Sequence, residues 1–131
     1  MATVAGTIQN VFGFTTPAGP KVNGSGNAIQ SCFITATFSG TYAQADNAQI
    51  AAVGAGIAAV RRDGKTVTLV QACLAFPGDE AGSIVGAKTV AVSTDALTME
   101  LTTSDLSTEH SGAALGTFNA PIGFFVTYTL S

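Results

Sequence analysis

The most unusual feature of this sequence is how little charge it carries. Only 10% of its 131 residues are charged, against about 25% in an ordinary soluble domain. Five lysine and arginine residues are too few for the basic stripe that neutralises several phosphates, which argues against a nucleic-acid partner. Disorder requires high charge and low hydrophobicity, whereas 47% of this chain is hydrophobic, so a folded domain is expected.

Other absences argue against further classes of function. The chain has no tryptophan and only two tyrosines, which argues against a carbohydrate or base-stacking platform. Cys32 and Cys73 are too few for a disulfide framework, and we predict free thiols, with a single bridge as the alternative. The segment 1–14 has neither a basic start nor a continuous apolar run, so no export signal is predicted and synthesis in the cytoplasm is expected. The uncharged segment 22–45 alternates polar with apolar residues, so no membrane span is predicted.

Alternation at every second position predicts a fold rich in strands. The pattern is clearest in residues 28–42, 97–103 and 122–130. In the first of these runs, one face carries only apolar residues: Cys32, Ile34, Ala36 and Phe38. Residues 66–76 are apolar on both faces, which predicts a central strand, and residues 3–12 are a candidate first strand.

One segment departs from this alternation and predicts a short helix over about residues 46–62. Its apolar residues fall three or four positions apart, as on one helix face: Ile50, Val53, Ile57 and Val60. Asp46 or Asn47 is the expected N-cap and Gly64 the expected C-cap.

Glycine- and proline-rich segments divide the strands. We expect a loop at 17–26, a turn at 77–80 and a long polar connection at 104–116. The segments together predict one domain, 1–131, with an all-β, jelly-roll-like antiparallel β-sandwich and one short helix.

The sequence matches known catalytic and ligand-binding motifs only weakly. Gly64-Lys65-Thr66 lacks the earlier glycine and the strand–loop–helix order of a phosphate-binding loop, and Gly54-Ala55-Gly56 lies inside the helical stripe. His110, the single histidine, has no evident nucleophile and is expected to be exposed in a loop. Asp95, Asp105 and Glu109 have no diagnostic calcium spacing. We therefore predict no catalytic residue, no cofactor, no metal and no small-molecule substrate.

The order of several sequence features resembles that of a known family. The strand end Phe38-Ser39-Gly40-Thr41-Tyr42 leads through Ala45-Asp46-Asn47-Ala48 to the helical segment, which closes on Arg61-Arg62-Asp63-Gly64-Lys65-Thr66-Val67-Thr68. The strand Leu97–Thr102 and an uncharged end through Pro121-Ile122-Gly123-Phe124 follow. In this order the chain resembles the capsid decoration, or cement, proteins of tailed bacteriophages, which are jelly-roll-like virion proteins.

The resemblance implies a homotrimer on the capsid surface that binds the major capsid protein and stabilises the phage head. The distribution of charge favours an assembly of this kind, since the 21 residues from Ser111 onward carry none and the first 45 carry only Lys21. Subunit interfaces are depleted in charge at their centres. We predict that residues 1–14 form an arm or edge strand that contacts a neighbour. The interface residues we expect are Val4, Ile8, Val11, Phe12, Phe14 and Phe125.

Two other classes of function stay open. The chain could be another virion component, such as a head fibre base or a tail component. It could also be a soluble ligand-binding jelly roll or a small enzyme, which would require a deep polar pocket near His110.

Overall fold

Eleven strands and one helix form most of the part of the chain that the computed structural model describes, residues 3–15, 29–80, 83–102, 108–111 and 113–131. The strands are β1 (Thr3–Thr15), β2 (Ile29–Phe38), β3 (Gly40–Tyr42), β4 (Asn47–Ile50), β5 (Val67–Phe76), β6 (Gly78–Glu80), β7 (Ser83–Ser93), β8 (Ala96–Thr102), β9 (Ala113–Leu115), β10 (Phe118–Ala120) and β11 (Ile122–Leu130). The helix α1 spans Val53–Arg61. The predicted all-β class with one short helix is confirmed.

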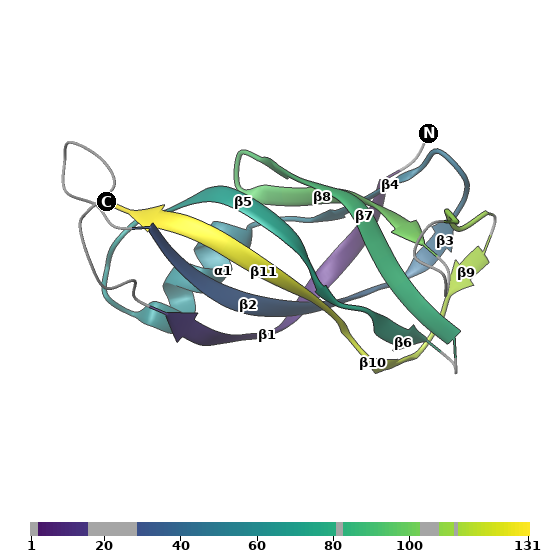
Figure 1. Cartoon of the computed structure of the whole chain (residues 1–131), viewed down its shortest axis with the longest axis horizontal. Helices are drawn as coiled ribbons and strands as arrows, with labels where there is room; N and C mark the ends of the chain where they lie inside the picture. Colours follow the sequence, from purple (N-terminus) through teal and green to yellow (C-terminus); the bar gives the residue numbers. More distant parts are fainter. Residues whose placement is uncertain (1–2, 16–28, 81–82, 103–107, 112) are drawn as a thin grey trace.

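Nine strands form one sheet in the order β10-β6-β7-β8-β4-β1-β2-β11-β5. Every neighbouring pair is antiparallel except β1 and β4, which run parallel. The sheet curls, so that β5 at one end packs against β7, while β3 and β9 form a small separate sheet (Figure 1). The sheet is therefore mixed, with the expected antiparallel pairing everywhere except between β1 and β4, and the jelly-roll arrangement is not confirmed.

The parallel strand β4 occupies residues that were expected to begin the helix. Ala48 and Ile50 are fully buried and alternate with the more exposed Asn47 and Gln49, and Ala48 lies directly opposite Val4 of β1. Ile50 fits both the helical spacing and this two-residue alternation. Pairing with β1 and β8 satisfies the backbone of β4, so the helix begins only at Val53.

The caps of α1 also differ from the prediction. The N-cap is Ala52, in the left-handed conformation (φ 55°) and with no side-chain cap of its own, and the C-cap is Arg62 (φ 59°) rather than Gly64. Asp46 instead accepts a hydrogen bond from the backbone N–H of Ala43 at 3.0 Å. The cap interaction at the start of α1 comes from the turn between β7 and β8, where the carboxylate of Asp95 accepts the Gly54 N–H at 2.6 Å.

The interior of the curled sheet forms a continuous apolar core. The inward faces predicted from alternation are confirmed as buried in β2, β8 and β11. These residues are Cys32, Ile34, Ala36, Phe38, Leu97, Met99, Leu101, Ile122, Phe124, Val126, Tyr128 and Leu130. Val53 and Ile57 of α1 bury against the same core, as does Ile50 of β4, but Val60 is 47% exposed, so only the last residue of the predicted stripe lies outside the core.

Three further expectations concern segments between strands. The predicted strand 66–76 corresponds to β5 (Val67–Phe76), which among the described strands pairs with β11 alone, so the prediction of a central strand is wrong. The predicted turn at 77–80 is also wrong, because Gly78–Glu80 forms β6 and finds partners in both β7 and β10. Within the predicted connection 104–116, β9 pairs with β3, while 103–107 and 112 lie outside the described residues, as does the predicted loop at 17–26.

Candidate functional site: an uncharged sheet face

Five neighbouring strands of the sheet contain no charged residue. In spatial order they are β4, which has only 4 residues, and the four longer strands β1, β2, β11 and β5. Figure 1 shows β11, from the C-terminal end of the chain, lying between β2 and β5. Their inward side chains form part of the core, and we call the opposite surface of these four strands the uncharged face.

Each of the four strands contributes one phenylalanine to this face. Phe12, Phe33 and Phe125 lie directly opposite one another in the strand register, and residues opposite one another point to the same side of a sheet. The Phe12 and Phe33 rings stack with centroids 5.7 Å apart, and Phe33 meets Phe125 edge to face at 5.2 Å. On β5, the Phe76 ring lies against the Cα of Gly123, where an added Cβ would clash with it.

The face is apolar at its centre yet open to solvent. Phe12 is 44% exposed and Phe76 is 38% exposed, while Phe33 and Phe125 are half-buried by each other and their neighbours. The outward positions around these rings include five uncharged polar residues: Thr37, Ser31, Gln71, Thr127 and Thr129. An exposed aromatic centre with a polar rim is typical of a surface that binds another protein.

A free cysteine lies within the face. Cys73 is exposed on β5, opposite Phe125 in the register, whereas Cys32 is buried on the inner side of β2. Both are free thiols in the structure, as predicted. Burial raises the pKa of Cys32 from 9.0 to about 11, and the nearby positive charge of Arg61 opposes that shift.

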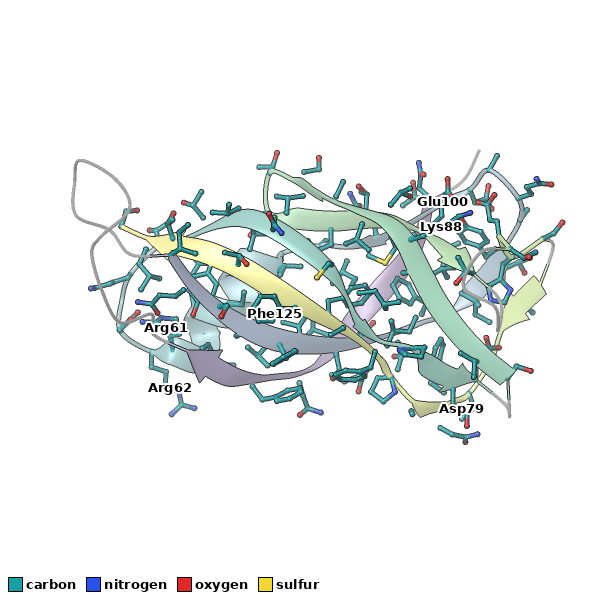
Figure 2. All side chains as sticks on the ribbon, in the orientation of Figure 1. Arg61, Arg62, Asp79, Lys88, Glu100 and Phe125 are labelled. Atoms are coloured by element: carbon teal, nitrogen blue, oxygen red, sulfur yellow. The ribbon has the colours of Figure 1, made fainter. Side chains whose placement is uncertain are left out.

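The charged side chains of the described residues lie outside these four strands. In Figure 2 the labelled charged residues lie near the ends of the molecule and on other strands, whereas Phe125 lies over the middle of the four strands. Lys88 of β7 approaches Glu100 of β8 at 3.7 Å. Arg61 at the end of α1 pairs with Asp63 at 2.7 Å and donates to Tyr128 Oη at 3.2 Å.

The structure divides the predicted interface residues into two groups. Val4 is buried in the core (6% exposed), and Ile8 and Val11 pack partly buried against it, so these three point away from the uncharged face and Val4 is unavailable to a neighbour. Phe12 and Phe125 lie on the face, joined through Phe33, while Phe14 is 39% exposed.

The N-terminal segment is not a detached arm. β1 pairs with β2 along most of its length and with β4 over Thr3–Gly6. Beyond Gly6 its second edge has no strand partner among the described residues, and α1 packs there, with Gly56 close to Ile8. Contact between this segment and a neighbouring subunit stays a prediction.

Phe33 and Phe76 lie on this face but were not among the predicted interface residues. For Phe33 a signal was available in the alternation of β2, which places its side chain on the side of the strand opposite Cys32. Phe76 carried no such signal, because the irregular register between β5 and β11 interrupts the alternation near it.

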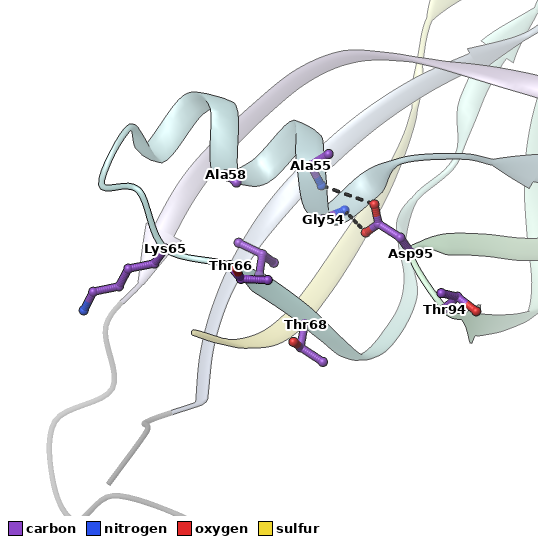
Figure 3. Close-up of a pocket in the computed structure, with 9 residues that line it drawn as sticks. Gly54, Ala55, Ala58, Lys65, Thr66, Thr68, Thr94 and Asp95 are labelled. Atoms are coloured by element: carbon purple, nitrogen blue, oxygen red, sulfur yellow. Dashed lines mark hydrogen bonds between the residues drawn. The ribbon is translucent and has the colours of Figure 1, made fainter. Parts of the chain in front are cut away.

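A groove of about 500 Å³ lies between α1, the start of β5 and the turn between β7 and β8. Gly54 and Lys65, each from one of the weak motifs of the sequence, both line this groove, but Figure 3 shows the Lys65 side chain extending away from Gly54. The Asp95 carboxylate already accepts the N–H groups of Gly54 and Ala55 at 2.6 and 3.4 Å. Since this carboxylate occupies the helix N-terminus with negative charge, the groove is poorly suited to a phosphate.

The histidine lies elsewhere, beside a buried tyrosine. His110 is half-buried rather than exposed as expected, because its ring packs edge to face against Tyr42 with centroids 6.3 Å apart. The Tyr42 hydroxyl is 2.6 Å from the Asp46 carbonyl and 2.7 Å from the Glu109 carboxylate, so its single proton serves two acceptors. Burial, with the hydrogen bond to Glu109, raises the Tyr42 pKa. His110 is not among the residues lining the groove, so the groove is not the pocket that a ligand-binding function predicted.

No group of three or more histidine, cysteine, aspartate or glutamate residues in the described segments is arranged to hold a metal ion. Of the three weak calcium candidates, Asp95 caps α1, Glu109 contacts Tyr42, and Asp105 lies outside the described residues. No helix among the described residues is long and apolar enough to cross a membrane.

Comparison with known proteins adds no relative to this description. No protein-family model, curated protein or solved structure matches the chain.

Proposed function

We propose that this chain is a structural subunit of a bacteriophage virion, a capsid decoration protein that binds the major capsid protein and associates with copies of itself. The observation that carries the proposal is the uncharged face, which exposes one phenylalanine from each of four neighbouring strands. A folded domain with such a surface gains stability when a partner removes the rings from water.

The uncharged face also fits the chemistry of permanent assemblies. Interface centres are depleted in lysine, glutamate and aspartate and enriched in aromatic residues, and the four strands follow this pattern. A decoration protein of this kind stabilises the head because it binds the assembled lattice and not the dissociated subunits, which shifts the equilibrium toward the shell.

On this proposal the protein is made in the host cytoplasm and acts on the outer surface of the capsid. It needs no cofactor, metal or small-molecule substrate, and its partners are protein surfaces. The family resemblance implies a homotrimer. A head fibre base or a tail component is the alternative, and the position of the protein in images of virions distinguishes these.

The test is co-sedimentation of the purified chain with shells assembled from the major capsid protein of the same genome. We expect saturable binding and a higher temperature of shell disruption when the sites are filled. A folded protein that stays in the supernatant at every concentration, while the shells remain intact, would show that the proposal is wrong.

A further inference from the structure

We propose that the uncharged face binds the same face of a second copy of this chain, so that two sheets pack face to face around a two-fold axis. The inference rests on the self-association contained in the proposed function and names the surface and the partner. The evidence is the charge, the size and the aromatic content of the face.

Charge is the first argument for a second copy. Around a two-fold axis a surface meets itself, so a charged residue near the axis lies close to its own copy and repels it. The strands β1, β2, β11 and β5 have no such residue at any position. A partner with a complementary charged patch would find nothing on this face to pair with.

The size of the face is the second argument. β2, β11 and β5 contain 10, 9 and 10 residues. At about 3.4 Å per residue these strands are about 30 Å long, and four strands about 4.8 Å apart span about 19 Å. The resulting area of about 600 Å² per copy is at the small end of specific interfaces, whose usual size is about 800 Å² per partner. We therefore expect a dimer that dissociates on dilution.

The arrangement of the rings is the third argument. Phe12, Phe33 and Phe125 are held in a row by contact with one another, and Phe76 is held against the backbone of Gly123. Rings that are already fixed lose little conformational freedom when a partner covers them. Sheets that pack face to face lie about 10 Å apart and bury side chains of this kind between them.

Pairing of identical faces gives a dimer, whereas the resemblance to decoration proteins implies a trimer. In a closed trimer the face would have to meet a different surface of the neighbouring copy. Mass and surface protection therefore distinguish the two arrangements.

Cys73 makes the face directly measurable in the unmodified protein. Its thiol is exposed beside Phe125 in a single copy, and pairing of the faces would cover it. Cys32 is buried in the core and should not react in the folded protein, so it reports unfolding.

The experiment measures mass and thiol reactivity together, with a reductant present during the mass measurement to exclude disulfide-linked dimers. By analytical ultracentrifugation over about 1 μM to about 500 μM, the mass should rise from the 13.1 kDa monomer to twice that value. Over the same range the rate of Cys73 alkylation should fall at least about tenfold. A protein that stays monomeric, or one that associates while Cys73 keeps its monomer rate, overturns the inference.

Two variants test whether the face itself is responsible. Gln71→Lys adds a charge at an exposed position of the face, opposite Thr127 in the register, and should weaken the dimer at least about tenfold. Ala91→Lys adds the same charge at an exposed position of β7, away from the face, and should leave the dimer unchanged. Equal effects of the two variants, with both proteins folded by circular dichroism, would contradict the proposal.

Shell binding is measured separately, so the two proposals can fail independently. A protein that binds shells but never pairs through this face overturns the inference and leaves the proposed function standing. Protection of Cys73 only when shells are present also overturns it, because the face would then belong to the capsid contact. A protein that dimerises with Cys73 protected but binds no shell supports the inference and contradicts the proposed function.

Discussion

Alkaline pH should destabilise this protein through one buried thiol. Cys32 is fully buried on the inner side of β2, opposite Val126. Burial raises its pKa from 9.0 to about 11 because the thiolate cannot be solvated there. In the unfolded chain the thiol loses its proton from about pH 9 upward, whereas in the folded protein it keeps it. The stability linked to this thiol is therefore complete below pH 9 and is lost as the pH rises through 11.

The size of the effect follows from the two pKa values. A pKa difference of two units corresponds to at most about 2.7 kcal/mol of unfolding free energy. About 1.4 kcal/mol of this is lost by pH 10 and about 2.3 kcal/mol by pH 11. The Cys32→Ala variant should be less stable at neutral pH, since it removes a buried side chain, but it should lack this pH-dependent loss.

The assay is urea unfolding followed by circular dichroism at pH 8, 9, 10 and 11. Tyr42 and Tyr128, whose pKa values burial also raises, are present in both proteins, so their losses largely cancel in the difference. The Cys73→Ala variant, changed at the exposed thiol, is the control and should follow the wild type. If the wild-type and Cys32→Ala curves stay parallel from pH 8 to 11, the reasoning from burial is refuted.

Two further predictions concern the backbone. Asp95→Ala should lower the unfolding free energy by about 1 kcal/mol, because the first N–H groups of α1 lose their acceptor, while Asp95→Asn should retain most of the stability. Urea unfolding at pH 7 measures the stability of both variants, and equal losses would contradict a capping role for Asp95. Gly78→Ala should lower the unfolding free energy by about 1–3 kcal/mol, because the added Cβ would lie 2.7 Å from the backbone oxygen of Ala120. Gly116→Ala, where the atom nearest to the added Cβ is a side-chain oxygen at 3.4 Å, should lower it by less than about 1 kcal/mol. Thermal unfolding of the two variants provides the comparison, and equal shifts in melting temperature would show that the contact with Ala120 is unimportant.

The sequence predicted the core where a strand has one polar and one apolar face. In β8, Leu97, Met99 and Leu101 are buried between half-exposed residues, as the alternation required. The prediction from the sequence failed where the local pattern was compatible with both a helix and a strand. Ile50 satisfied both helical and strand spacing, and the choice was made by pairing with β1, a strand more than forty residues earlier in the chain.

The candidate site was predicted only in part, for a related reason. Composition marked the two ends of the chain as uncharged, and Phe12 and Phe125 were selected from them. The sequence could not show that β5, which belongs to the charged middle of the chain, joins the same surface. Its apolar residues on both faces indicated a buried central strand, but one face covers the core and the other is exposed.

The strand order explains how a sparse distribution of charge becomes one continuous surface. Phe125 of β11 lies opposite Phe33 on one side and Cys73 on the other, so the last strand of the chain joins β2 to β5. The charges of the described residues lie in β6, β7, β8, α1 and the segments between the strands and the helix. Since solubility requires charge somewhere on the surface, its complete absence from four adjacent strands fits a surface that is covered in the assembled state better than one that stays in water.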